Sequence, residues 1–206
     1  MPPLGVPART LRAPATFSGV GLFTPGKASI TVRPAAPGHG IVFRRIDLPG
    51  RPAIPARAER TIARERQTVL AAAPGASGRV GVSVQTVEHL LSALNALGVT
   101  DALIDLAGAE VPLLDGSARD FAQGLLGAGL VAAGGGNAPA EARVMAPICF
   151  AENGGAIEAH PLPDDGTGPR LEVEYRLDYG AAYPNLRGVA SFTLRYGAPD
   201  VQGAAR

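Results

Sequence analysis

The chain has 206 residues, a formal net charge of +1 and a hydrophobic content of 46%. This length is sufficient for one ordinary domain or two small ones with a sizeable core, and the composition excludes a largely disordered protein. The near-neutral charge also excludes a strongly basic surface for nucleic acid.

The first half of the chain alternates strand-like and turn-like segments. Residues 28–32 and 41–46 are rich in β-branched side chains and are predicted strands, with a loop over the Pro- and Gly-rich residues 34–40. Further short strands are expected within 61–73 and 80–84, joined through 74–78. The glycines of residues 18–26 resemble a dinucleotide-binding loop, but no helix follows them and Pro25 interrupts the run. Turns between strands are therefore the better interpretation of that segment.

The period of the apolar residues changes to that of a helix over residues 86–97. Val87, Leu90, Leu91, Leu94 and Leu97 recur at steps of three and four and share one face. Thr86 is a plausible N-cap and Gly98 is expected to end the helix. A strand is predicted over residues 101–106.

A second helix is predicted after Asp115 and Gly116, with Phe121, Leu125 and Leu126 as its apolar residues. Asp115 or Ser117 is expected to cap its start, with Asp120 as the acid of a capping box. Asp115 as an acid and Ser117 as a nucleophile are the functional alternatives. Asp-Gly-Ser is typical of turns and caps, and no base is indicated for the serine, so we favour the structural role.

The C-terminal part has a different pattern. Residues 132–139 are the best linker in the sequence, and predicted strands follow at 143–150, 156–160, 171–177 and 189–194, without a helix. The sequence therefore predicts an α+β fold with two domains. The expected boundaries are a first domain at 1–131, a linker at 132–141, a partial second domain at 142–196 and a frayed tail at 197–206. A sheet without helical cover would expose its apolar face.

The single cysteine and the N-terminal residues indicate the cellular compartment of the protein. Cys149 cannot form an intramolecular disulfide, and its apolar neighbours predict a buried residue rather than a reactive thiol. Residues 1–15 lack the apolar segment of a signal peptide, and no apolar run approaches the ~20 residues of a membrane span. We therefore expect a cytoplasmic protein without a transmembrane segment.

Glu88 and His89 are the strongest candidates for chemistry. Adjacent helical side chains diverge by about 100°, so the two cannot bind one metal ion as a pair at i and i+4 can. They can lie on either side of a site, with the imidazole on a metal ion and the carboxylate on a water molecule. On the dipeptide alone, an exposed glutamate at a helix start beside an ordinary histidine is the better interpretation.

The other polar candidates carry less information. Arg44 and Arg45 alternate across a predicted strand, so one is expected to face solvent and the other to be available to an anion. His39 lies between glycines and His160 precedes a proline, so both are expected to be loop residues rather than metal ligands.

Several segments, in order, resemble a family of bacterial zinc amidases. These enzymes remove the acetyl group from UDP-3-O-acyl-N-acetylglucosamine, the committed step of lipid A synthesis. The resemblance rests on residues 19–22, 32–35, 40–47, 67–70, 84–94 and 111–118, with looser similarity over 143–194. It implies a two-domain β-α-α-β sandwich whose first domain is complete here and whose second domain is truncated to strands.

The resemblance also implies residue roles, and it reverses the preference stated above for Glu88 and His89. His89 matches the family's first Zn²⁺ ligand, and Glu88 matches the general base that activates the metal-bound water. Leu70 matches a position that lines the substrate cleft. The substrate would be UDP-3-O-acyl-N-acetylglucosamine, and Asp115 keeps its structural role.

The chain departs from the family pattern in two ways. The family's remaining zinc ligands, a histidine and an aspartate one helical turn apart, have no counterpart here, nor do the threonine and histidine that assist at the oxyanion. Phe23 also replaces the histidine usual in the opening motif. A catalytic zinc site needs three protein ligands, so this chain alone is expected to bind zinc poorly. A split enzyme completed by a second chain, and a non-catalytic relative, remain alternatives.

Overall fold

The computed structural model describes residues 8–64, 66–72, 81–134, 144–152, 154–163, 170–178, 180–181, 185 and 187–195. These residues belong to two compact units, with residues 8–134 in the first and 144–195 in the second. Within the described ranges the fold is α+β, as predicted, and both α-helices lie in the first unit. Neither of these helices is long and apolar enough to cross a bilayer.

The first unit contains the following elements in chain order. Its strands are β1 (Arg9–Leu11), β2 (Ala15–Val20), β3 (Lys27–Pro34), β4 (Ile41–Arg45), β5 (Ala53–Pro55), β6 (Thr61–Ile62), β7 (Val69–Ala71), β8 (Ser83–Gln85), β9 (Ala102–Ala107) and β10 (Leu130–Ala132). A 3₁₀ helix, η1 (Ala58–Arg60), precedes β6, and the α-helices are α1 (Glu88–Ala96) and α2 (Arg119–Ala128).

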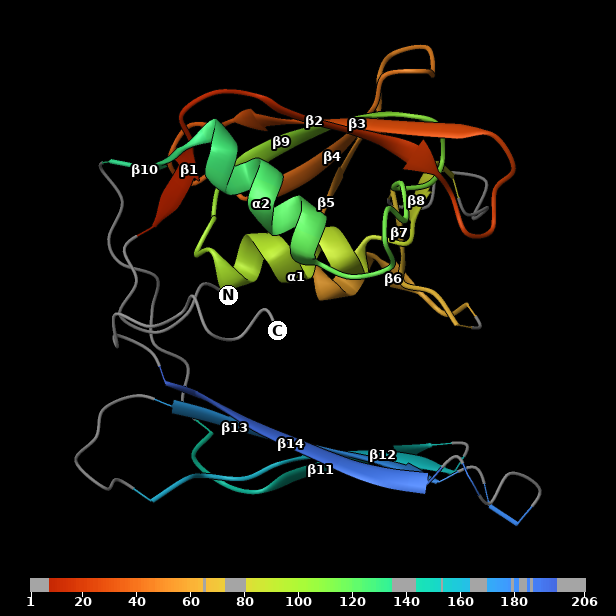
Figure 1. Ribbon diagram of the computed structural model, residues 1–206, viewed down its shortest axis with the longest axis vertical. Coiled ribbons are helices and arrows are strands. Elements are labelled where there is room, and N and C mark those ends of the chain that lie inside the picture. Colours follow the sequence, from red (N-terminus) through yellow and green to blue (C-terminus); the bar gives the residue numbers. More distant parts are fainter. Residues whose placement is uncertain are drawn as a thin grey trace. The chain divides into compact units, whose positions relative to one another are not determined.

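The strands of the first unit form three sheets. The main sheet has the order β2-β3-β9-β4-β5 and is antiparallel except between β4 and β9 (Figure 1). A smaller antiparallel sheet has the order β6-β7-β8, and β1 pairs with β10. The β1–β10 pair joins the beginning of the unit to its end, since Arg9 lies opposite Ala132.

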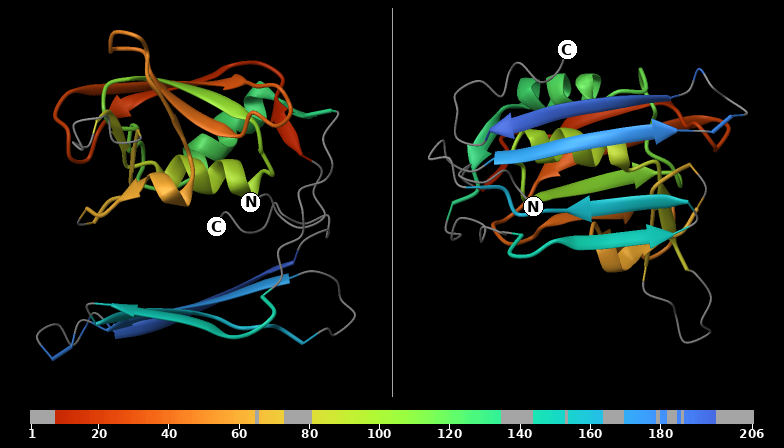
Figure 2. Two further views of the ribbon diagram at one scale, coloured as in Figure 1. Left: turned by 180° about the vertical axis from the view of Figure 1, so that it is seen from behind. Right: turned by 90° about the horizontal axis from the view of Figure 1, so that it is seen from below.

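Both helices cover the same face of the main sheet (Figures 1 and 2). Alternate residues of each strand point to this face, which is why β3 buries Ala28, Ile30 and Val32. The rings of Phe17 on β2 and Phe121 on α2 meet edge to face, with centroids 5.0 Å apart. The core is therefore formed by one sheet face, two helices and the inner face of the small sheet.

The opposite face of the main sheet is polar. Asp105 on β9 accepts a hydrogen bond of 2.7 Å from Arg33 Nε and one of 2.6 Å from Arg44 Nε. Arg45 points inward, pairs with Asp47 at 2.7 Å and donates to the Ser83 carbonyl at 2.8 Å, which joins β4 to β8. Both Arg44 and Arg45 are thus paired with carboxylates of this chain, and Arg44 shares Asp105 with Arg33.

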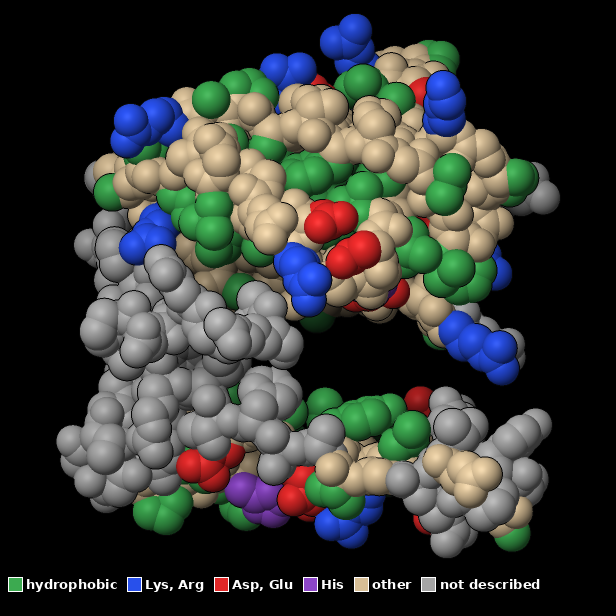
Figure 3. Space-filling view, viewed as in Figure 1, with side chains coloured by type: hydrophobic (Ala, Val, Ile, Leu, Met, Phe, Trp, Pro, Cys, Tyr) green, Lys and Arg blue, Asp and Glu red, His purple; other side chains and the backbone are tan. Residues whose placement is uncertain are grey.

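Within its described residues, the second unit contains two antiparallel hairpins. They are formed by β11 (Ile148–Glu152) with β12 (Gly155–Ala159) and by β13 (Arg170–Asp178) with β14 (Arg187–Arg195). Apolar side chains lie exposed on these hairpins, as Figure 3 shows. They include Ile148, Phe150, Ile157, Leu171 and Tyr175. Strands are present at all four predicted places, but the first begins at Ile148 rather than at residue 143.

Cys149 is exposed, so the prediction that it is buried is wrong. Strand alternation places it on the face opposite Ile148 and Phe150, and among the described residues nothing packs over that face closely enough to bury it. Its Sγ lies 3.9 Å from a carboxylate oxygen of Glu158, across the hairpin. His160 follows β12 directly and lies outside the strand, as expected.

The predicted C-terminal ends of both helices are confirmed, since Gly98 follows α1 and Gly129 is the C-cap of α2. Gly98 has φ +67° and its N–H donates to the Asn95 carbonyl at 3.0 Å, which ends α1 where the sequence predicts. Ala132 belongs to β10 rather than to a linker. Residues 135–139 of that predicted linker, the predicted connection at 74–78 and the predicted tail at 197–206 lie outside the described residues.

Candidate functional site

Glu88 and His89 are the first two residues of α1. Val87, the residue before the helix, is completely buried, and Leu90, Ala93 and Leu94 bury the inner face of α1. This apolar face fixes the rotation of the helix, so that Glu88 and His89 lie half-buried at its N-terminal end. A carboxylate in the first helical turn is stabilised by the helix dipole.

The carboxylate of Glu88 has an unsatisfied oxygen. Its Oε2 atom is buried and has no hydrogen-bond partner within the described part of the chain, a property shared only with Oε1 of Gln67. Buried polar atoms in folded proteins are nearly always hydrogen-bonded, so this carboxylate oxygen is free to accept a further hydrogen bond. Water or a polar substrate group would satisfy it.

The metal-binding capacity of the site is limited. Among the described residues, no group of three or more His, Cys, Asp or Glu side chains is placed to hold a metal ion. His89 offers one imidazole, whereas a catalytic zinc site needs three protein ligands and an open position. The described residues therefore do not form a zinc site by themselves.

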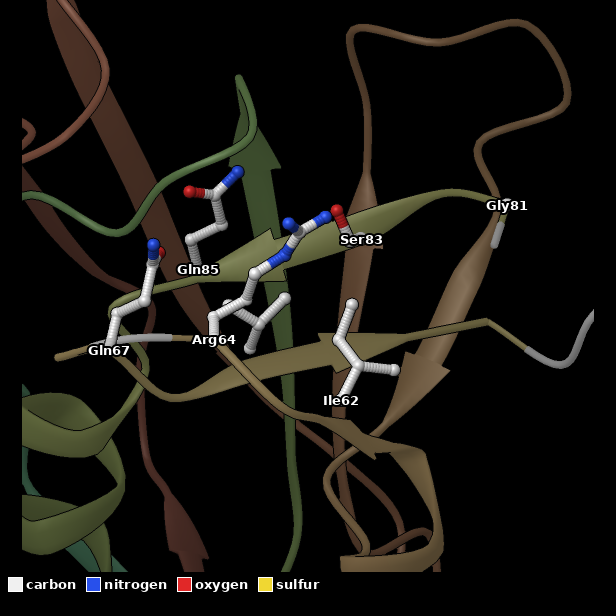
Figure 4. Close-up of a pocket in the computed structure, with 7 residues that line it drawn as sticks. Ile62, Arg64, Gln67, Gly81, Ser83 and Gln85 are labelled. Carbon is white, nitrogen blue, oxygen red and sulfur yellow. The ribbon is translucent and has the colours of Figure 1, made fainter. Parts of the chain in front are cut away.

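A groove of about 410 Å³ lies on the outer face of the β6-β7-β8 sheet (Figure 4). Its lining residues are Ile62, Arg64, Gln67, Val69, Gly81, Ser83 and Gln85. Only Thr86 and Val87 lie between Gln85, at the end of β8, and Glu88, and the Thr86 N–H donates to the Thr68 carbonyl at 3.0 Å. The groove therefore lies beside the segment that leads into α1, and its polar side chains are suited to a polar ligand.

Leu70 lies on the other face of β7. Its side chain is 3% exposed and belongs to the core, while its neighbour Val69 lines the groove. Strand alternation explains this division. Leu70 as a substrate contact stays a prediction.

The Asp115–Ser117 segment forms the predicted turn, but the N-cap position of α2 is Ala118, without a side-chain capping bond, rather than Asp115 or Ser117. The Ser117 N–H donates to Asp115 Oδ1 at 2.9 Å, and Ser117 Oγ accepts from the Arg119 N–H at 3.1 Å, where α2 begins. The Ser117 hydroxyl also donates to Asp115 Oδ1 at 2.8 Å, and the hydrogen bonds from the Ser117 N–H and hydroxyl lower the pKa of Asp115. His39 is exposed and lies in a turn.

Thr86 is not the N-cap of α1, so that prediction is wrong. The cap position is Val87, which has no side-chain capping bond, and Thr86 has φ +56°. The Thr86 hydroxyl instead donates to Glu110 Oε1 at 2.8 Å. The Thr86 hydroxyl therefore binds the buried Glu110 carboxylate instead of a backbone N–H at the start of α1.

Glu110 is the residue that sequence patterns missed. It is 1% exposed, and its carboxylate also accepts the backbone N–H groups of Leu22, Phe23 and Thr24 at 2.6–3.2 Å. Burial opposes the charged form, but the hydrogen bonds from Phe23, Thr86, Thr24 and Leu22 outweigh it and hold the pKa of Glu110 below its ordinary value. The only sequence signal was an acidic residue next to the apolar run 111–114.

Comparison with known proteins defines the class. The family model described as LpxC, UDP-3-O-acyl N-acetylglycosamine deacetylase, matches residues 8–196. The UDP-3-O-acyl-N-acetylglucosamine deacetylase of Thermosynechococcus vestitus is 38% identical over 177 residues, which is 85% of this chain and 55% of the relative. The deacetylase of the same name from Myxococcus xanthus is 44% identical over 130 residues, or 63% of this chain and 39% of the relative.

The chain belongs to this deacetylase family, and the resemblance inferred from the sequence motifs is confirmed. A further relative with the same name, from Xylella fastidiosa strain Temecula1, is 43% identical over 123 residues, or 60% of this chain and 38% of the relative. The matched regions span about half the length of the first of these curated relatives and less of the others.

Proposed function

We propose that this chain supplies the Glu88–His89 part of the active site of a cytoplasmic deacetylase. The substrate would be UDP-3-O-acyl-N-acetylglucosamine and the reaction the hydrolysis of its acetamide in lipid A synthesis. Residues 1–131 would form the first domain and residues 142–196 the opening strands of the second. The names of the relatives support this substrate and reaction.

The observation that carries the proposal is the orphan Oε2 of Glu88 beside a half-buried histidine at the start of α1. In the proposed reaction, Glu88 accepts a proton as a water molecule attacks the acetyl carbonyl carbon. The carbon–nitrogen bond then breaks, and Glu88 returns the proton to the departing nitrogen. The products are acetate and a free amino sugar, so atoms and charge balance.

His89 would contribute one ligand to a zinc ion, and the other ligands would come from outside the described residues. The absence of a three-ligand cluster among the described residues supports a shared site. The same observation favours a second candidate, a non-catalytic relative that binds a partner or the nucleotide-sugar lipid without turnover. Leu70, on β7, would be a minor contact with the substrate.

A chimeric enzyme distinguishes these possibilities. Residues 8–196 of this chain would be fused to the portion of the Thermosynechococcus relative that follows its matched region, and acetate release from UDP-3-O-acyl-N-acetylglucosamine would be measured. Adding that portion as a separate polypeptide tests the split-enzyme alternative in the same assay.

We expect the chimera to be active and Glu88→Gln to lower kcat by about 10²- to 10⁴-fold, the usual contribution of a general acid–base group. Glu59→Gln is the matched control, because Glu59 is an exposed carboxylate on η1. Near-normal turnover by Glu88→Gln would refute the role of Glu88. A folded but inactive chimera that binds the substrate would favour the non-catalytic relative.

A further inference from the structure

We propose that Glu110 is a positioning residue, which joins the Leu22–Thr24 loop to Thr86 and thereby sets the position of Glu88 and His89. The inference rests on the proposed function for its catalytic consequence. The coupling of the Leu22–Thr24 loop to Thr86 through the Glu110 carboxylate is argued only from hydrogen bonds within this chain.

The first step is the geometry of the carboxylate. Oε1 accepts from the Leu22 N–H at 2.8 Å and from the Thr86 hydroxyl at 2.8 Å, and Oε2 accepts from the Thr24 N–H at 2.6 Å. Consecutive backbone N–H groups that converge on one anion form a specific site for negative charge. Here that anion is the chain's own side chain, and the same oxygen that binds the loop also binds Thr86.

The second step is the close fit around Glu110. A Cβ placed on Gly21 would lie 2.3 Å from Glu110 Oε2 and 3.0 Å from the Thr24 carbonyl oxygen. Only glycine therefore allows the Leu22–Thr24 loop to approach the carboxylate. The loop also carries Phe23, whose side chain is 43% exposed although its backbone is held by Glu110.

The third step is the backbone at Thr86. A positive φ is costly for a β-branched residue, and such a conformation persists only where the surroundings over-determine it. Gln85 pairs with the residues on either side of Glu110. Its N–H donates to the Ala109 carbonyl at 2.9 Å, and its carbonyl accepts from the Val111 N–H at 3.1 Å. The Thr86 hydroxyl bond to Glu110 completes this restraint two residues before Glu88.

A buried, charged Glu110 can thus hold the Leu22–Thr24 loop and Thr86 together. Val87 is enclosed by the core, so a change in the backbone at Thr86 must be passed to the first turn of α1 rather than absorbed by it. We infer that loss of the Glu110–Thr86 bond reorients Glu88 and His89 while the hydrophobic face of α1 keeps the helix in place.

The test uses Thr86→Val, which removes the hydroxyl and keeps the β-branched shape, in the full chain. We expect the backbone amide resonances of Leu22–Thr24 and of Glu88 and His89 to shift in a ¹H–¹⁵N spectrum, with the helical circular dichroism unchanged. Thr86→Ser, which retains the hydroxyl, should restore the wild-type positions. Thr16→Val is the matched control, since it removes a threonine hydroxyl bonded to Thr31 on the exposed sheet face.

Shifts confined to residues 85–87 in Thr86→Val, or shifts of the same size in Thr86→Ser, would overturn the inference. In the chimera, Thr86→Val should lower kcat about tenfold or more with little change in KM, as expected for a misplaced catalytic group. If Glu88→Gln leaves the chimera active, the proposed function fails, and the amide shifts still decide whether Glu110 couples the two segments. If the amides couple but kcat is unchanged, the positioning role is refuted.

Discussion

Replacement of Gly21 by alanine tests how much the hydrogen bonds of the buried Glu110 carboxylate contribute to stability. The new Cβ would lie 2.3 Å from Glu110 Oε2 and 2.7 Å from its Cδ. Carbon atoms pack at about 3.5–4.0 Å, so the carboxylate must retreat by roughly 1 Å. The Oε2 hydrogen bonds to the Thr24 and Phe23 N–H groups, 2.6 and 3.2 Å long, would then be broken.

The expected loss of stability follows from these two bonds. A hydrogen bond to a charged group contributes about 1.5–3 kcal/mol, so two of them amount to roughly 3–6 kcal/mol. Alanine restricts the unfolded chain and offsets about 0.4–1 kcal/mol, because Gly21 does not have a positive φ. We therefore expect Gly21→Ala to lower the free energy of unfolding of the first unit by about 2–5.6 kcal/mol.

Urea denaturation followed by the helical circular dichroism signal measures this change, because both helices of the described chain lie in the first unit. Gly127→Ala is the matched control, since a Cβ there meets no atom within 4 Å. A wild-type unfolding midpoint for Gly21→Ala would refute the reasoning. The reasoning would also be refuted if Gly21→Ala cost the Glu110→Ala variant as much stability as it costs the wild type, because that variant has no carboxylate for the new Cβ to meet.

Three further predictions concern the same unit. Phe121→Ala should lower the free energy of unfolding by about 3–5 kcal/mol in the same urea titration, because its fully buried ring contacts Phe17. Gly124→Ala should destabilise α2 while Gly127→Ala is neutral or stabilising, since a Cβ on Gly124 would lie 2.4 Å from the Phe17 ring; equal melting temperatures would contradict this. The Arg45 hydrogen bond lowers the pKa of Asp47, and that of Glu110 is also lowered, so both folded values lie below the unfolded ones. Their stabilisation is therefore complete above about pH 5 and is lost as the pH falls through the folded values, which midpoints measured from pH 7 to 3 will show.

The local elements of the fold were predictable because their signals are periodic. Leu90 and Leu94 mark one helical face, and Gly98 ends α1 with the positive φ that only glycine adopts easily. The short strands β1, β5 and β10 were not predicted, because three-residue strands carry too little alternation to be recognised. Their pairing is set by contacts between distant segments, such as Arg9 with Ala132. Strand β2 was also missed, since its end lies in the glycine-containing segment 18–26 that was assigned to turns.

The site was predictable only in part. The order of the motifs identified the family and drew attention to Glu88 and His89, which open α1 as expected. The partner of Thr86 was not predictable, because Glu110 lies 24 residues away and its proximity depends on the bridge between Gln85 and Glu110. Cys149 was misjudged because apolar neighbours along a strand do not show whether its own face is covered.

The metal content of the chimera tests the central claim most directly. After dialysis against a weak chelator, we predict about one zinc ion per molecule in the chimera and in its His39→Ala control, whose exposed imidazole lies in a turn. His89→Ala should lose most of this zinc, and the chain alone should retain far less than one ion per molecule. Full zinc retention by His89→Ala, or a full zinc complement in the chain alone, would contradict the account.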